Sequence, residues 1–349
     1  MAHTRIRWLD AAKGLSILLV ILWHVTTTTR DVTGVALPVQ MFVNETFSPI
    51  RMPLFFLVSG MVASKYLTAS FSTIGRAKIW PLLWASTIWS IVSIVTVALF
   101  VLPGRDGTTV WKTALRIIVS PVFPNGALWF LFVLAASFVT LRALAALRPV
   151  LHVGLAGAVA LVFSLVVGAF GYEYRDVILN NAYEGYLRYY LFFAVGALYG
   201  RRIIELAGRL KLSRAAIAAA AGVGIIATLA SVGIAELPGV AFVVRLFGAA
   251  VGIVLAVALQ SVTLLTHLGA RTLWIYVAHG TVYTIGLWIA TKLMPRGWDT
   301  ISTNLLVGAL LVACVLIGLL LAAASKRSRA TDYAFTPPPL PERRTRSDV

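Results

Sequence analysis

The sequence has 349 residues, of which 59% are hydrophobic and only 12% are charged, and its mean hydropathy is +0.88. Soluble domains carry about 25% charged residues, so this composition excludes an ordinary globular protein and indicates a surface that faces lipid. The formal net charge of +17 does not indicate nucleic-acid binding, because the basic residues lie in short loops between apolar runs, as the positive-inside rule predicts for a membrane protein.

The chain contains a single cysteine, Cys314, within a late apolar run. One cysteine can form neither an intrachain disulfide nor a cysteine metal site, and we expect no metal ion and no permanently bound cofactor. The first apolar run contains a histidine and is followed by threonines instead of a small-residue cleavage site. We therefore interpret it as a spanning helix and not as a cleaved signal peptide.

About ten apolar runs are long enough to cross roughly 30 Å of hydrocarbon as helices. They cover residues 10–28, 50–67, 79–102, 127–147, 151–171, 186–206, 214–234, 238–264, 273–294 and 302–324. The segment 111–120 is shorter and more mixed, which is typical of a helix in the membrane interface. Because Lys and Arg are more frequent in the loops on one side, we expect both termini in the cytoplasm. The sequence thus predicts an all-α, multi-pass protein of the inner (plasma) membrane.

Two regions differ in composition. Residues 1–324 form the predicted membrane domain, and residues 325–349 form a basic, proline-rich tail. The tail has little apolar surface to bury, so we expect it to be disordered in the cytoplasm. It would either contact anionic lipid headgroups or remain solvated and mainly fix the topology.

The first predicted helix carries ionisable residues along one face. Lys13 and His24 are eleven residues apart in RIRWLDAAKGLSILLVILWHV (5–25). At about 100° and 1.5 Å per residue they lie on the same face, separated by about 16 Å along the axis. Asp10 falls on nearly the same stripe. This face therefore presents an acid and a base near the cytoplasmic end and an imidazole near the middle of the membrane.

Each of these residues has a structural and a functional interpretation. Ionisable groups within the membrane are costly and usually face a cavity or a partner. Histidine is well suited to accept and return a proton near neutral pH, for example from a sugar hydroxyl during acyl transfer. Alternatively, His24 is a neutral residue that bridges two helices, and Lys13 is an anchor whose amine reaches the interface.

Four ordered motifs resemble membrane acyltransferase family 3. The first is Lys13, which lies in the sequence Asp-x-x-Lys-Gly and is followed after ten further residues by His24. The others are RMPLFFLVSGMVASKY (51–66), ALWFLFVL (127–134) and LGARTLWIYVAHG (268–280). They extend over about 270 residues, and ten helices fit the family. Arg51 stands before Met-Pro where many family members have histidine.

The resemblance implies a function. It implies transfer of an acyl group, commonly acetyl, from cytoplasmic acyl-CoA to a hydroxyl of an envelope glycan or glycolipid. His24 matches the essential histidine of the family and would act as general base or transient acyl carrier. Lys13 matches a position that is often arginine. Lysine keeps the charge but lacks the bidentate geometry of arginine toward phosphate.

Basic residues before the third predicted span are candidates for donor binding. Arg76 and Lys78 lie in GRAKIWPLLW (75–84), where they could bind the CoA phosphates together with Lys13. They could equally serve only to set the topology. The family often carries arginine before a proline here, which Arg76 and Pro81 match. We expect these cations and His24 to share one water-accessible chamber.

Further ionisable residues are candidates for substrate binding. His279 would lie about 12 Å above Arg271 in the ninth predicted span, and it could approach His24 or simply pack. Arg245 lies in an apolar helix and needs a carboxylate, carbonyls or water. Glu184 and Arg188, in NNAYEGYLRYY (181–191), could bind a sugar together with the aromatic residues around them. Those tyrosines could also be ordinary interface residues.

Two other functional classes fit the same residues. A transporter would use the buried histidines and arginines for the passage of protons or substrate. A non-catalytic scaffold would retain the motifs without activity. We expect an O-acyltransferase, with acyl-CoA, the acceptor and the lipid bilayer as its partners.

Overall fold

The computed structural model describes residues 6–101, 110–124, 126–170, 181–294 and 297–338, and within these ranges it contains helices and no strands. The prediction of an all-α fold is confirmed. The long helices are α1 (Arg7–Thr33), α2 (Pro38–Ala63), α4 (Trp80–Phe100), α6 (Trp129–Ala143), α7 (Pro149–Phe170), α9 (Asn181–Gly208), α10 (Leu212–Ser231), α11 (Val240–Ala258), α13 (Thr272–Leu293) and α14 (Thr300–Ser325).

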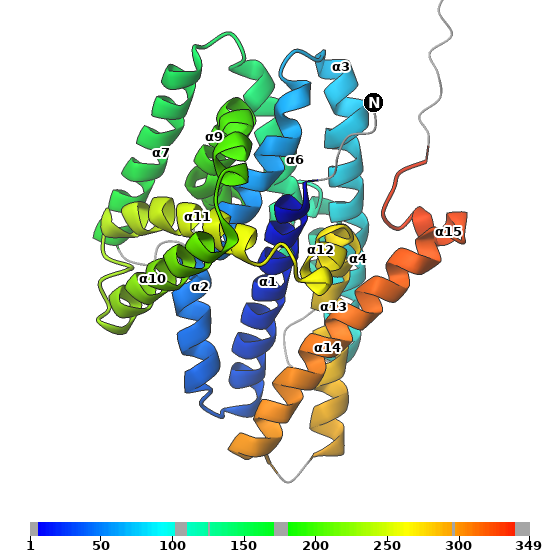
Figure 1. The fold of residues 1–349 in the computed structure, drawn as a ribbon. Coiled ribbons are helices and arrows are strands. Elements are labelled where there is room, and N and C mark those ends of the chain that lie inside the picture. The colour runs from blue at the N-terminus through cyan, green and yellow to red at the C-terminus, as the bar shows by residue number, and fades with distance from the viewer. Residues whose placement is uncertain (1–5, 102–109, 125, 171–180, 295–296, 339–349) are drawn as a thin grey trace, which may run out of the picture.

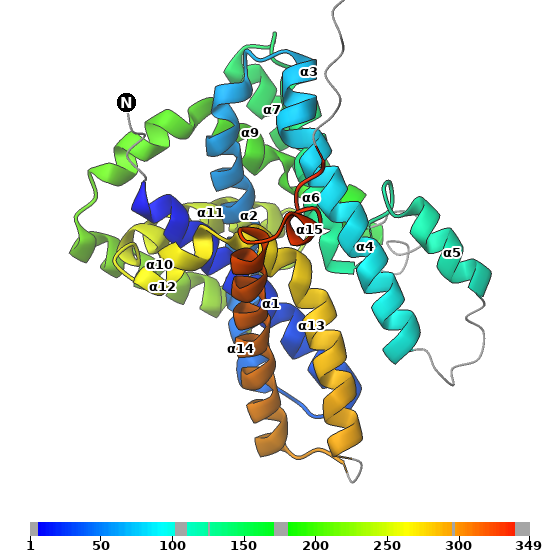
Figure 2. The same cartoon turned by 90° about the vertical axis from the view of Figure 1, so that its right-hand side faces the viewer.

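Shorter helical segments connect or extend these helices. They are η1 (Ser64–Tyr66), α3 (Phe71–Ile74), the π-helical turn η2 (Gly75–Ile79), α5 (Val110–Val119), η3 (Gly126–Leu128), α12 (Thr263–Gly269) and α15 (Arg329–Asp332). The segments α3, η2 and α4 follow one another without a break. The predicted interfacial segment 111–120 is helical and forms α5, which lies beside the far end of α4 (Figure 2).

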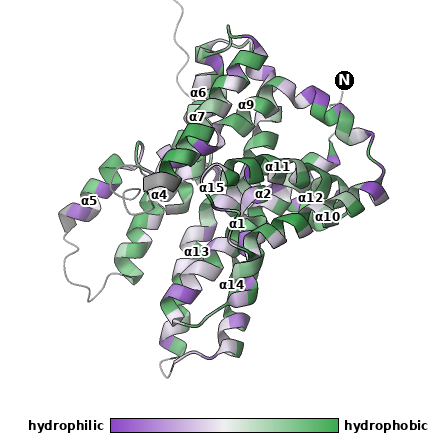
Figure 3. Cartoon of the chain, turned by 90° about the vertical axis from the view of Figure 1, so that its left-hand side faces the viewer, coloured by the Kyte–Doolittle hydropathy of each residue, from purple (hydrophilic) through white to green (hydrophobic). Residues whose placement is uncertain are grey.

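Nine helical segments in the described part of the chain are long and apolar enough to cross a membrane, which supports the multi-pass prediction. The remaining predicted span, 186–206, lies within α9. This helix has 28 residues but does not meet the same criterion, because charged residues and tyrosines lower its hydropathy. Large apolar side chains are exposed along α7 and α14, for example Leu151, Val162, Leu305 and Leu316, and apolar residues cover these helices in Figure 3.

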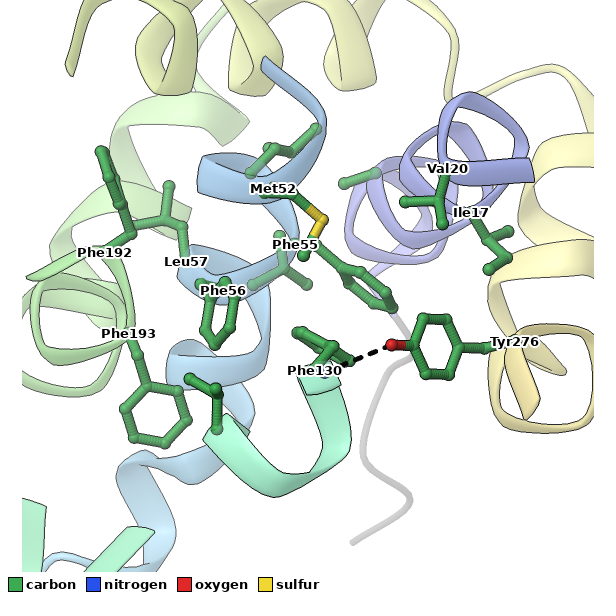
Figure 4. Close-up of a cluster of buried hydrophobic side chains, with 14 of the residues drawn as sticks. Ile17, Val20, Met52, Phe55, Phe56, Leu57, Phe130, Phe192, Phe193 and Tyr276 are labelled. Carbon is green, nitrogen blue, oxygen red and sulfur yellow. Dashed lines mark hydrogen bonds between the residues drawn. The ribbon is translucent and has the colours of Figure 1, made fainter. Parts of the chain in front are cut away.

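The interior is built around α1 and α2. Helix α2 packs against α9, α1 and α11, while α1 packs against α12 and α13. Helices α10 and α11 cross α2 steeply, and α13 and α14 form an antiparallel pair (Figure 1). A buried aromatic cluster that includes Phe55, Phe56, Phe130, Phe193 and Tyr276 fills the centre (Figure 4).

Glycine allows α1 and α12 to approach at van der Waals distance. A Cβ atom on Gly14 would lie 2.0 Å from the carbonyl oxygen of Leu265, and one on Gly269 would lie 1.8 Å from the carbonyl oxygen of Asp10. Since no real Cβ contact is this short, each helix supplies a glycine where the backbone of the other passes. The crossing fixes the start of α1, on which Lys13 and His24 depend for their positions.

The prediction that residues 325–349 are disordered is wrong for the part after α14 that the structure describes. Helix α15 is followed by Phe335, whose side chain is 1% exposed and contacts the rings of Trp89 and Trp274. The indole nitrogens of Trp84 and Trp89 donate to the backbone carbonyls of Tyr333 and Ala334, at 2.7 and 2.9 Å. The tail thus supplies acceptors that these two indoles need. Residues 339–349 lie outside the described residues.

Candidate functional site

A cavity of about 610 Å³ lies between the C-terminal half of α1, the N-terminal half of α2, the start of α9 and the connection from α10 to α11. Its wall contains three carboxylates, two guanidinium groups, one imidazole and several aromatic rings. The residues that line it are Val20, Trp23, His24, Glu45, Ser48, Arg51, Met52, Ala127, Trp129, Glu184, Gly185, Arg188, Tyr189, Ala230, Gly233, Ala235, Glu236 and Tyr276. An aromatic, charged cavity of this size is large enough for a small polar ligand.

His24 is half-buried on α1 and faces this cavity. Its ring lies against two residues of α13. The centroid of the His279 ring is 5.3 Å away, and that of the Tyr283 ring is 6.3 Å away in a stacked arrangement. The two histidines that the sequence analysis singled out therefore meet, although 255 positions separate them.

His279 is fully buried, with an exposed fraction of 0%. Its Nδ1 atom hydrogen-bonds to the backbone carbonyl of Tyr276, and its Nε2 atom is buried without a partner. Because a carbonyl oxygen only accepts, Nδ1 carries the proton and Nε2 presents a lone pair. The ring is thus held in one tautomer, with an acceptor next to His24.

Tyr276 connects this pair to the opposite wall of the cavity. Its hydroxyl donates to the carbonyl of Ala127 and accepts from the backbone N–H of Phe130 at 3.3 Å, as Figure 4 shows. Phe130 in turn stacks on Phe55, with ring centroids 4.6 Å apart. Tyr276 thereby fixes the start of α6 and the adjacent Trp129. Tyr276 lies in the motif LGARTLWIYVAHG (268–280), but the sequence alone indicated no role for it.

Glu184 and Arg188 form an ion pair in the cavity wall. Their side chains are 5% and 16% exposed, and Arg188 Nη2 lies 2.6 Å from Glu184 Oε1. Next to them, Tyr189 stacks on Trp129 with centroids 6.0 Å apart. The Trp129 ring lies over Gly185, where a Cβ atom would come within 2.2 Å of it. The predicted combination of a carboxylate, an arginine and aromatic rings is present on one surface.

Arg245 does not line the cavity, but its partner does. Arg245 is 8% exposed, and its Nη2 atom lies 3.2 Å from Glu236 Oε2. Glu236 follows α10 and lines the cavity. The carboxylate that the intramembrane arginine needs is therefore Glu236, and Arg245 acts on the cavity wall through this ion pair.

Lys13 and Asp10 pair with each other near the start of α1, with Lys13 Nζ 3.2 Å from Asp10 Oδ1. Arg76 and Lys78 lie in η2, and the Lys78 amine is 5.6 Å from the centre of the Tyr66 ring. None of Lys13, Arg76 and Lys78 lines the cavity that contains His24.

The expectation that these cations and His24 share one chamber is therefore wrong for this structure. The reason is the packing of α1 between Lys13 and His24. Ile17 and Ile21 are 0% exposed and Val20 is 5% exposed, and these side chains belong to the central apolar cluster. They form an apolar floor between the cavity and Lys13.

Arg51 lines the cavity, although the sequence alone indicated no role for it. Its guanidinium carbon lies 4.6 Å from the centre of the Trp23 ring. One of its Nη atoms is buried without a hydrogen-bond partner. In the sequence, Arg51 stands directly before Met-Pro, at a position where many members of the family that this chain resembles have histidine.

Residues 6–323 match the profile of a family described as an acyltransferase domain, acyltransferase family 3. The chain is 24% identical over 367 residues to the inner membrane protein YcfT of Escherichia coli, with 96% of each chain covered. No solved structure matches. The profile covers nearly the whole chain, and the protein is therefore a multi-pass membrane protein that belongs to acyltransferase family 3.

Proposed function

We propose that the protein is an O-acyltransferase of the inner membrane that transfers an acyl group, acetyl in the simplest case, from cytoplasmic acyl-CoA to a hydroxyl of an envelope glycan or glycolipid. The family supports acyl transfer. The observation that carries the rest is the position of His24, which faces a cavity of about 610 Å³ whose walls combine aromatic rings with carboxylates and guanidinium groups. Such walls suit sugar hydroxyls, because rings stack on sugar faces while charged groups hydrogen-bond the hydroxyls.

In this proposal the acceptor occupies the cavity. Trp129 and Tyr189 provide apolar surfaces, and the Glu184–Arg188 pair orients hydroxyl groups. His24 acts as general base on the reacting hydroxyl or as transient acyl carrier. The Nε2 lone pair of His279, which has no partner in the structure, would accept a hydrogen bond from the neighbouring imidazole during the reaction and so orient it.

The donor enters from the other end of α1. With the termini in the cytoplasm, Lys13, Arg76 and Lys78 bind the CoA phosphates by charge-assisted hydrogen bonds. The cavity then opens on the opposite side of the membrane, where envelope glycans are. The acyl group must pass the apolar floor at Ile17, Val20 and Ile21 to reach His24, so the reaction includes a movement at this level.

Transfer of radiolabel from acetyl-CoA tests the proposal on purified protein in nanodiscs, with an extract of the source envelope as acceptor. Label should reach a hydroxyl acceptor or the protein itself, and His24→Ala should abolish it because the base is lost. His152→Gln is a matched control, since His152 is also a buried histidine, bonded to the Tyr190 hydroxyl at 2.7 Å, but lies outside the cavity.

Normal labelling by a folded His24→Ala protein would contradict the assignment. Accumulation of a solute in vesicles that requires no acyl-CoA would indicate a transporter instead. Absence of label together with correct folding of the wild-type protein would indicate a scaffold.

A further inference from the structure

The guanidinium of Arg51 lines the cavity without a directly paired carboxylate in the described part of the chain, and Glu236 acts on it only through a longer-range electrostatic interaction. Among the described residues the guanidinium makes no hydrogen bond or ion pair, and one Nη atom is fully enclosed. The guanidinium carbon lies over the face of Trp23, 4.6 Å from the centre of the ring. Trp23 directly precedes His24 in α1, and Arg51 and His24 are near enough to interact electrostatically. Arg51 and His24 therefore line the same cavity.

Such an arrangement is costly. A charged side chain within a membrane loses its hydration, and a buried donor without a partner loses the hydrogen bond that water would give it. The carboxylates that could relieve this cost pair with other residues. Glu184 is 2.6 Å from Arg188, and Glu236 is 3.2 Å from Arg245. Glu45 is exposed and forms no ion pair with Arg51.

We propose that Arg51 is the oxyanion-binding residue of the acyl transfer, an inference that rests on the proposed function. The acceptor hydroxyl oxygen forms a bond to the thioester carbonyl carbon while His24 takes the hydroxyl proton. The carbonyl π pair moves to oxygen, and the part of the Arg51 guanidinium that lines the cavity binds the resulting oxyanion. When the intermediate collapses, the carbon–sulfur bond breaks and the CoA sulfur receives the proton from His24.

The charges of the cavity favour a transient anion over an anionic acceptor. Its lining contains the carboxylates Glu45, Glu184 and Glu236 but only the two guanidinium groups of Arg51 and Arg188. Since Arg245 also offsets Glu236, the cavity has no excess of positive charge that would hold a permanent anion. A charge that exists only during the reaction, within reach of a fixed donor, gains the most from such preorganisation.

Trp23 is a positioning residue in this scheme. A guanidinium held over the face of an indole by a cation–π contact has less freedom to move. Arg51 can thus meet the oxyanion without reorganisation at the moment of reaction.

Kinetics of CoA thiol release from acetyl-CoA in nanodiscs test the inference, with the same envelope extract as acceptor. In Arg51→Gln we expect kcat to fall about 10²- to 10³-fold, with KM for acetyl-CoA within twofold of wild type. The kcat of Arg51→Lys should lie between those of wild type and Arg51→Gln, because lysine keeps the charge but lacks the planar, bidentate donors of a guanidinium. Arg30→Gln, which removes an exposed arginine paired with Asp31, should leave kcat unchanged.

The outcomes separate this inference from the proposed function. An active wild type, an inactive His24→Ala and a fully active Arg51→Gln would overturn the oxyanion role alone. A higher acceptor KM at unchanged kcat would also overturn it and make Arg51 an acceptor anchor. If neither wild type nor variants release CoA, the proposed function fails and the inference with it. If Arg51→Gln does not fold, Trp23→Leu decides: kcat should fall about tenfold, and an unchanged kcat would contradict the inference.

Discussion

At the scale of single residues, the site depends on polar atoms whose partners are set by the backbone. The backbone carbonyl of Tyr276 accepts a hydrogen bond from Nδ1 of His279. The hydroxyl of the same tyrosine donates to the carbonyl of Ala127 and accepts from the backbone N–H of Phe130. One residue thus fixes both the tautomer of a histidine and the wall of the cavity. The only free atom in this group is Nε2 of His279, next to His24.

Substitution of His279 tests this orientation. His279→Ala should lower kcat by about 10²-fold, because the base loses its hydrogen-bond acceptor, while KM for acetyl-CoA changes little. His279→Asn should retain more activity, since its amide can donate to the Tyr276 carbonyl and accept from His24 through separate atoms. Equal kcat for a folded His279→Ala protein and wild type would show that His279 only packs.

The sequence identified the individual candidates and part of their grouping, such as the approach of His279 to His24. His24, Glu184 and Arg188 now line one cavity, and His279 joins them through α13. Their cost within a membrane made each visible in the sequence. That Lys13 and Arg76 would not share this cavity could not be predicted, because helical periodicity gives the face of α1 but not what fills the space beside it. The side chains of Ile17 and Val20 decide this, and apolar residues are expected anywhere in a spanning helix.

At the scale of elements, the crossing of α1 and α12 fixes the position of the start of α1 and therefore that of His24. Gly14 and Gly269 are the points at which the two backbones touch. Without a hydrophobic driving force between helices in lipid, close packing at small residues supplies much of the association energy. A change at this crossing should therefore affect stability and activity together.

Gly269→Ala should destabilise the protein by about 1–3 kcal/mol, as overpacking does, because its Cβ would lie 1.8 Å from the Asp10 carbonyl. Gly280→Ala is the matched control, since no atom lies within 4 Å of a Cβ there, and alanine is the better helix former. Thermal unfolding in detergent measures both. Equal midpoints for the two variants would mean that the crossing adapts.

Helix existence was predictable and helix ends were less so. The run 50–67 predicted the second helix, yet α2 begins at Pro38, twelve residues earlier. Polar residues such as Asn44 and Glu45 lower hydropathy there, although Asn44 is buried and Glu45 lines the cavity. Hydropathy predicts contact with lipid, and this part of α2 faces protein and cavity instead.

At the scale of the whole molecule, the chain after α14 returns to cover α4 and α13. Its composition predicted disorder, because proline and arginine dominate it. One aromatic residue, Phe335, enters a site between Trp89 and Trp274, and two indoles donate to its neighbours. The average composition of the segment does not reveal that one aromatic residue, Phe335, is buried.

Phe335→Ala should therefore lower the free energy of unfolding by about 3–5 kcal/mol, as for other buried phenylalanines. Tyr333→Ala, which removes a side chain that is 43% exposed but keeps the carbonyl that Trp84 uses, should change it by less than about 0.5 kcal/mol. Unfolding midpoints of the purified full-length variants give the comparison. A Phe335→Ala protein as stable as the Tyr333→Ala protein would show that the tail does not contribute.

The floor of buried aliphatic side chains beneath His24 has a consequence for the cell that holds this protein. A continuous aqueous path from Lys13 to the cavity would let ions and protons leak down the membrane potential, which is worth about 2.3 kcal/mol per charge for each 100 mV. A dry constriction of isoleucine and valine blocks such leakage, since water leaves hydrophobic necks. Under the proposed function, this constriction keeps the bilayer electrically sealed while the acyl thioester reaches His24.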